Sequence, residues 1–176
     1  MIIWLNGAFG AGKTTTARAL TGVLPDARLF DAEQVGYLLR SIGGLPILGD
    51  FQHWPPWRAL VVDTARQVLD YVGGTLVIPQ TVLIRRYWDE ISAGIAAAAI
   101  PLRHVVLHAE QDALTRRIEV DTAENRRWRL DHLAHYRQAL EWLTAEAEVV
   151  DTTHRPPADT VELVISALES ATGPPA

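Results

Sequence analysis

The chain of 176 residues contains no cysteine and a single methionine. Without cysteine it can form neither a disulfide, nor a thiolate metal site, nor a cysteine nucleophile. It also lacks an apolar run near the ~18 residues that a membrane-spanning helix needs. The longest candidate, residues 93–100, is short and rich in alanine. We therefore expect no transmembrane segment and a cytoplasmic location.

Positive charge is scarce as well. Lys and Arg total 16 against 21 Asp and Glu, which gives a net charge of −5. A chain of this kind has no overall basic field for nucleic acid, so any anion must be bound locally. Apolar residues make up 48% of the chain, as in ordinary globular proteins. The length fits one domain over residues 1–176.

One stretch near the N-terminus carries a complete motif. Residues 7–14 read GAFGAGKT and match G-x-x-x-x-G-K-[ST] at every position. An apolar run, 1–6, precedes the motif, and a helical pattern, 13–24, follows it. Backbone N–H groups in such a loop surround phosphate oxygens, and the helix N-terminus adds its positive dipole. The alternative is a glycine-rich turn without a ligand.

The motif predicts binding of ATP with Mg²⁺. Lys13 should reach the β- and γ-phosphates, and Thr14 should ligate the metal. The predicted nucleotide-binding residues of the loop are Gly7, Gly10, Ala11, Gly12, Lys13, Thr14 and Thr15.

Apolar strands alternate with helical patterns along the rest of the chain. Strands are expected at 1–6, 28–31, 75–79, 103–109 and 148–153. Helices are expected at 13–24, 32–42, 56–72, from 84 through the alanines at 96–99, and at 110–121, 128–145 and 159–168. This alternation predicts a three-layer α/β domain with a five-stranded parallel sheet. The glycine-rich loop and the carboxylate of Asp31 make it a P-loop NTPase domain by expectation. The short spacing between strands and the arginine-rich segment resemble nucleoside and metabolite kinases.

Asp31 closes the second predicted strand and should face the crevice at the carboxyl edge of the sheet. There it can act as a general base or help to hold Mg²⁺. It can equally serve only as the N-cap of the next helix. Arg40 lies farther along that helix, where it either clamps the ligand or is solvated. The third strand ends without a carboxylate, at Gln80.

Residues 43–56 are expected to form an irregular substrate-binding loop, because glycine and proline are frequent there. Asp50, Gln52 and Trp54 combine hydrogen-bonding groups with a flat ring, a mixture suited to a sugar or base. Trp57 is assigned to the core. Arg58 is assigned to the solvent side of the following helix.

An arginine cluster interrupts the acidic chain and predicts a lid at about 116–129 that closes on the phosphates. Arg116 and Arg126 are the candidates for stabilising the transferred group, with exposed, solvated arginines as the alternative. Asp151 and Thr153 resemble the segment that borders adenine in small kinases. The six histidines show no metal-ligand spacing, and His132 and His135 are interpreted as surface residues.

Several segments together resemble the ATP-binding tunicamycin resistance protein family. They are residues 1–14, 30–41, 50–52 with 56–58, and 76–81. That family binds ATP and protects against tunicamycin, a uridine-like nucleoside that carries amino sugars and a fatty acyl chain. The resemblance implies a substrate pocket formed by Asp31, Arg40, Asp50, Gln52, Trp54 and Gln80.

The expected function is therefore transfer of the γ-phosphoryl group of ATP to a hydroxyl of a tunicamycin-like nucleoside. One alternative is ATP-dependent sequestration of the drug without chemistry. Another is a kinase for an ordinary small metabolite. Peripheral membrane contact, and a monomer or a homodimer, stay open at this stage.

Overall fold

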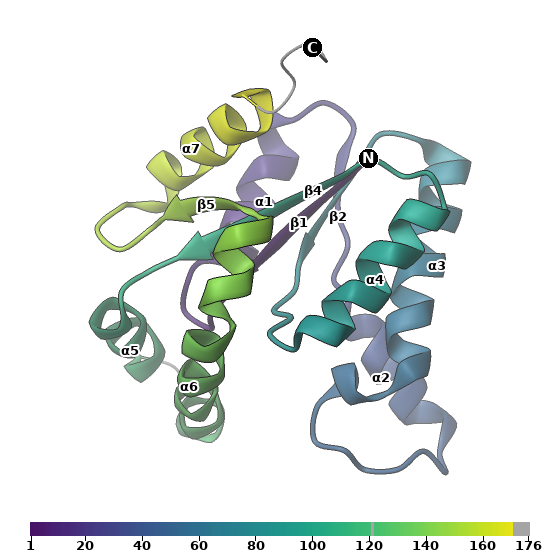
Figure 1. Ribbon diagram of the computed structural model, residues 1–176, viewed down its shortest axis with the longest axis horizontal. Helices are drawn as coiled ribbons and strands as arrows, with labels where there is room; N and C mark the ends of the chain where they lie inside the picture. The colour runs from purple at the N-terminus through teal and green to yellow at the C-terminus, as the bar shows by residue number, and fades with distance from the viewer. Residues whose placement is uncertain (121, 171–176) are drawn as a thin grey trace.

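A five-stranded sheet runs through the middle of the computed structural model, which describes residues 1–120 and 122–170 (Figure 1). Its strands are β1 (Ile2–Gly7), β2 (Ala27–Leu29), β3 (Thr75–Pro79), β4 (Leu102–His108) and β5 (Glu148–Asp151). They lie in the order β2-β3-β1-β4-β5, and every pairing is parallel. The predicted three-layer α/β architecture is confirmed.

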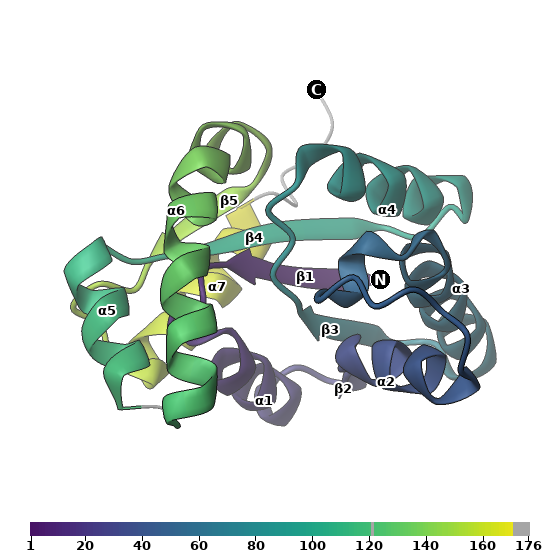
Figure 2. The same cartoon turned by 90° about the horizontal axis from the view of Figure 1, so that it is seen from below.

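Helices cover both faces of the sheet (Figure 2). The helical elements are α1 (Lys13–Val23), α2 (Glu33–Ile42), the 3₁₀ turn η1 (Phe51–His53), α3 (Pro55–Val72), α4 (Arg85–Ala97), α5 (Gln111–Glu119), α6 (Ala123–Glu146) and α7 (Pro157–Ser170). Helices α1 and α7 pack together on one face, and α3 and α4 lie side by side on the other. Helix α6 packs over β4 on the same side as α4.

The central strand β1 explains this layering. Its side chains alternate between two cores, with Ile3 and Leu5 facing one and Ile2 and Trp4 the other. All four are at most 1% exposed, as expected for a parallel strand buried on both faces. The carboxyl ends of β1, β3 and β4 therefore meet at one edge of the sheet.

Several element boundaries differ from the sequence-based prediction, and three of these differences concern the candidate site. Residues 43–56 are not wholly irregular, because η1 lies within them and α3 begins at Pro55. Helix α6 begins at Ala123, five residues before the expected start, so Arg126, Arg127 and Arg129 are helical. Strand β2 ends at Leu29. Asp121, the expected last residue of the helix at 110–121, lies outside the described residues.

Two neighbouring residues of α3 contrast with each other. Trp57 is fully buried, as predicted, and its indole N–H donates to the Ala32 carbonyl at 3.0 Å. Arg58 was expected on the solvent side, but it is only 6% exposed. No helix in the described part of the chain is both long enough and apolar enough to cross a membrane.

Candidate nucleotide and acceptor site

The glycine-rich loop connects β1 to α1 at the carboxyl edge of the sheet. Gly10 and Gly12 have φ values of 81° and 93°, which side chains with a Cβ rarely adopt. At Gly7, a Cβ would lie 2.3 Å from the carbonyl oxygen of Leu107. Helix α1 then starts at Lys13 without a side-chain cap, which leaves the N–H groups of its first turn available to an anion.

The Lys13 ammonium lies within the loop. It donates to the carbonyl oxygens of Gly7 and Ala8 at 3.0 and 2.7 Å, and the side chain is buried. Burial, together with the nearby Arg129 guanidinium, lowers the pKa of Lys13 to about 7. A polyphosphate placed against this group would favour its charged form.

Arg117, from α5, forms hydrogen bonds with the glycine-rich loop and with the segment after β5. Its guanidinium donates to the carbonyl oxygens of Gly10 and Thr152, at 3.4 and 2.6 Å. The Thr152 hydroxyl donates to the His108 carbonyl at 3.0 Å and lies 3.4 Å from the carbonyl oxygen of Ala11. The predicted Arg116 is exposed on the same helix and lies outside the cavities described below. Arg117 is therefore the arginine of this pair that contacts the loop, and sequence analysis had not selected it.

A cavity of about 340 Å³ opens above the loop. This loop cavity is lined by Phe9, Gly10, Gly12, Lys13, Thr14, Thr15, Glu33, Pro79, Gln80, Thr81, Arg117 and Arg129. It thus brings together most of the predicted nucleotide-binding residues. Arg129, the last residue of the predicted lid at 116–129, was not selected as a candidate, and its guanidinium carbon lies 5.8 Å from the centre of the Phe9 ring.

The two carboxylates at the start of α2 differ in what they face. Asp31 accepts hydrogen bonds from the Glu33 amide at 3.1 Å and from the Gln34 side chain at 3.0 Å. It therefore does act as a helix cap, and it is not among the residues lining the loop cavity. Glu33 does line that cavity. Burial, reinforced by the charge of Asp31, raises the pKa of Glu33.

A second cavity of about 290 Å³ adjoins the first and shares Phe9, Glu33, Gln80 and Arg129 with it. We call it the central cavity. Four residues of the predicted substrate pocket line it, namely Arg40, Asp50, Gln52 and Gln80. The Arg40 guanidinium lies 4.5 Å from the centre of the Phe51 ring. The structure thus brings these four side chains together beside the loop.

A third cavity, of about 550 Å³, lies between η1 and α6, and we call it the cleft. Asp50 and Gln52 face it from one side, and Phe9 and Thr81 connect it to the loop cavity. Its other lining residues are His53, Leu83, Ile84, Arg85, His132, His135, Gln138, Ala139 and Trp142. His132 is partly exposed and His135 is exposed, in keeping with their interpretation as surface residues. Both also line the cleft, which only the packing of α6 reveals.

Trp54, Arg126, Asp151 and Thr153, which were also predicted as site residues, line none of these three cavities. Trp54 is 7% exposed and donates to the Pro46 carbonyl at 2.9 Å. It lines a groove at residues 40–54 that shares Arg40, Gly49 and Asp50 with the central cavity. Arg126 is exposed near the start of α6. Asp151 accepts from the amide and hydroxyl of Thr153 at 2.8 and 2.6 Å, and these bonds lower the pKa of Asp151. Roles for these residues in binding stay predictions.

The donor groups present suit a magnesium nucleotide. No cluster of three or more His, Cys, Asp or Glu side chains that could hold a metal occurs among the described residues. Mg²⁺ in nucleotide enzymes takes only one or two protein ligands, together with phosphate oxygens and water. Thr14 in the loop cavity can supply one such ligand, and Lys13 with the α1 amides fits the phosphates.

Comparison with solved structures finds the same fold in several proteins. A tunicamycin resistance protein from Deinococcus radiodurans is 23% identical over 99% of each chain, with a TM-score of 0.70. A sugar kinase from Janibacter sp. is 18% identical over 96% of this chain and 94% of that chain, with a TM-score of 0.67. A gluconokinase from Sinorhizobium meliloti is 19% identical over 96% and 91%, with a TM-score of 0.60.

At these identities the likeness concerns the fold. It confirms the predicted three-layer α/β fold and the resemblance in fold to a tunicamycin resistance protein. No protein-family model matches the chain, and no curated sequence does either.

Proposed function

We propose that this protein is an ATP-dependent phosphotransferase that acts on a hydroxyl of a small molecule. The observation that carries the proposal is the shared wall between the loop cavity and the two cavities beside it. A triphosphate held by the loop would end where Glu33 and Gln80 line both the loop and central cavities. An acceptor in the central cavity or the cleft would then lie in reach of the γ-phosphate.

In this proposal each group has a defined task. The α1 amides, Lys13 and Thr14 hold MgATP, and Arg129 neutralises charge that develops on the transferred group. Glu33 accepts the proton of the acceptor hydroxyl, whose oxygen forms the new bond to the γ-phosphorus as the bond to the β-phosphate oxygen breaks. The raised pKa of Glu33 brings this carboxylate closer to the range useful for a general base. Asp31 orients Glu33 by capping α2.

The acceptor that we favour is a nucleoside antibiotic of the tunicamycin type. The quoted sequence segments and the fold of the Deinococcus protein support this choice. ATP-dependent sequestration of the drug is the first alternative. A kinase for an ordinary sugar or sugar acid is the second, favoured by the sugar kinase and gluconokinase that share the fold. Because ATP is a cytoplasmic substrate, the proposal places the protein in the cytoplasm.

Mass spectrometry of candidate acceptors incubated with the protein and MgATP tests this function. We expect tunicamycin to gain the mass of one phosphoryl group with the wild-type protein and to stay unmodified with Lys13→Met. An unmodified but tightly bound drug would establish sequestration, whereas modification of a hexose or sugar acid alone would establish a metabolite kinase. No binding of MgATP by folded protein would contradict all three.

Two carboxamide variants separate the roles of the carboxylates. Glu33→Gln should lower kcat by roughly 10²–10⁴-fold, the usual contribution of a general base, with little change in the affinity for MgATP. Asp31→Asn should have the smaller effect, because an asparagine side chain can still accept the capping hydrogen bond. The reverse order would assign the base to Asp31, as the sequence alone had suggested.

A further inference from the structure

Arg58 is a buried cation outside the loop site. It lies in the second turn of α3, and its side chain is 7% exposed. Burying a guanidinium costs free energy unless its N–H groups form hydrogen bonds. The partners of a buried arginine therefore show which parts of the structure it holds together. For Arg58 these partners belong to η1 and α4.

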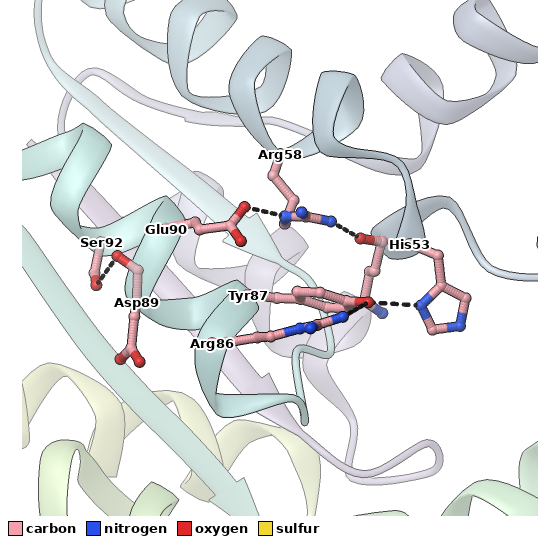
Figure 3. Close-up of polar contacts among 8 residues, drawn as sticks. His53, Arg58, Arg86, Tyr87, Asp89, Glu90 and Ser92 are labelled. Carbon is pink, nitrogen blue, oxygen red and sulfur yellow. Dashed lines mark hydrogen bonds and ion pairs between the residues drawn. The ribbon is translucent and has the colours of Figure 1, made fainter.

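The guanidinium connects two elements that are separate along the chain (Figure 3). Its Nε donates to Glu90 Oε2 of α4 at 2.5 Å, and its Nη1 donates to the Gln52 carbonyl of η1. Its central carbon also lies 4.2 Å from the centre of the Tyr87 ring, again on α4. One side chain of α3 thus fastens η1 to α4.

A second connection runs parallel to the first. The Tyr87 hydroxyl is 3.1 Å from His53 Nδ1, and it accepts a hydrogen bond from Arg86 Nη2 at 3.1 Å. Figure 3 shows the Tyr87 ring between the Arg58 and Arg86 guanidinium groups, with His53 at its hydroxyl end. With its hydroxyl oxygen already accepting from Arg86, Tyr87 can donate its own hydrogen to His53 Nδ1, which leaves the other ring nitrogen to donate to a ligand.

The η1 turn, held by these contacts, forms one wall of the central cavity and of the cleft. Gln52 faces both the central cavity and the cleft, and so does Asp50, the residue that caps η1. His53 faces the cleft. Asp50 is held to the turn through the Gln52 amide and side chain, at 3.0 and 3.2 Å. Any displacement of the Gln52 backbone would therefore move Asp50 and Gln52 together.

We propose that Arg58 is a positioning residue of the acceptor site, which holds η1 against α4 and so orients Asp50, Gln52 and His53 toward the acceptor. The proposal rests on the function proposed above, but Arg58 itself lines none of the three cavities. The planar guanidinium meets a carboxylate and a carbonyl at once, which a lysine ammonium does with far less directional control.

The first test measures affinities in Arg58→Met and Arg58→Lys, with tunicamycin as the acceptor probe. Arg66→Met is the matched control, because Arg66 lies on the same helix but its side chain is 38% exposed and pairs with Asp63 and Asp70. We expect Arg58→Met to raise the acceptor KM, or its Kd where no transfer occurs, by at least about tenfold. The Kd for MgATP should stay within about twofold of wild type, Arg58→Lys should recover only part of the loss, and Arg66→Met should match wild type in both measurements.

The second test needs no acceptor and uses the absence of cysteine in the chain. Spin labels at Leu48→Cys, just before η1, and at His135→Cys of α6 leave the contact between His53 and Tyr87 intact. Pulsed electron spin resonance reports the distribution of the distance between the two labels. This distribution should broaden or shift when Arg58→Met is added and should not change with Arg66→Met. If Arg58→Met does not fold, Arg58→Lys takes its place in both tests.

The outcomes separate this inference from the proposed function. If the wild-type protein binds MgATP but not tunicamycin, the choice of acceptor fails and the distance measurement alone decides the role of Arg58. An Arg58→Met distribution identical to that of Arg66→Met overturns the inference. Equal losses of MgATP and acceptor affinity also overturn it, because they would show a general structural role.

Discussion

Lys13 is the residue whose charge the nucleotide should change most. Its pKa is lowered to about 7, so about half of the molecules carry a neutral lysine at neutral pH. A bound triphosphate stabilises the ammonium form. Binding should therefore take up close to one proton at pH 8 and almost none at pH 6. The affinity for MgATP should fall roughly tenfold per pH unit above 7.

Titration calorimetry in two buffers of different ionisation enthalpy measures this proton uptake. Lys13→Arg is the control, because arginine keeps the positive charge but does not titrate in this range. Protonation of ATP itself is the same for both proteins, so it cancels in the comparison. Equal uptake by wild type and Lys13→Arg at pH 8 would contradict the lowered pKa.

At the scale of single residues, the glycine-rich motif predicted its site residues more accurately than the patterns in the rest of the chain did. The positions of Lys13 and Thr14 depend on local backbone geometry, which the eight consecutive residues of the motif determine. Asp31 and Glu33 lie two residues apart, and only the hydrogen bond from the Glu33 amide shows that the first caps the helix while the second lines the cavity. Arg117 could have been identified, since it follows Leu114 by three positions and thus shares the inward face of α5.

At the scale of elements, the contact between α2 and η1 depends on Gly36. A Cβ at this position would lie 2.3 Å from Cγ of Phe51, the first residue of η1. Gly36→Ala should therefore push the Phe51 ring away and lower the free energy of unfolding by about 1–3 kcal/mol through overpacking. The same change should weaken acceptor binding, because Phe51 precedes Gln52 in the turn.

Urea unfolding of Gly36→Ala against Gly22→Ala checks this expectation. Gly22 is an exposed residue of α1 with nothing within 4 Å of the position of a Cβ. Its replacement by alanine should stabilise the protein by up to about 1 kcal/mol through helix propensity alone. Two variants of equal stability would show that the Phe51 ring moves aside without cost.

Element boundaries followed from the sequence where an apolar stripe or a proline marks them. Helix α3 was predicted to within one residue because two prolines precede its apolar stripe. The first turns of α6 were missed because they carry arginines rather than apolar residues, and solvated arginines form helix as readily as loop. The η1 turn was missed because glycines and prolines on both sides favour irregular structure.

At the scale of the whole molecule, the contacts that could not be predicted join residues far apart in the chain. Arg58 and Glu90 are 32 residues apart, and Asn6 and His104 are 98 apart. Parallel strands alone do not fix which helices face each other across the sheet, so neither pair follows from a pattern. The same holds for the cleft, whose two walls come from η1 and α6.

His104 lies under the seam between α4 and α6, where its ring stacks on Trp88 at 3.9 Å. Its Nε2 is 3.3 Å from the Asn6 side-chain nitrogen. Its Nδ1 is the one buried side-chain nitrogen or oxygen without a hydrogen-bond partner in the described part of the chain. Burial lowers the pKa of His104 to about 4. Between about pH 6.5 and 4 the unfolded chain therefore binds a proton at His104 that the folded protein does not bind.

Unfolding is then favoured by acid in this window, and His104 alone should remove up to about 3 kcal/mol from the free energy of unfolding as the pH falls from 7 to 4. His104→Leu removes the titrating group and leaves Asn6 its bond to the Val82 carbonyl. Urea unfolding at pH 7, 6 and 5 should show the stability of the variant, relative to wild type, rising as the pH falls. A constant difference between the two proteins would mean that the imidazole is protonated in the folded state as readily as in the unfolded chain.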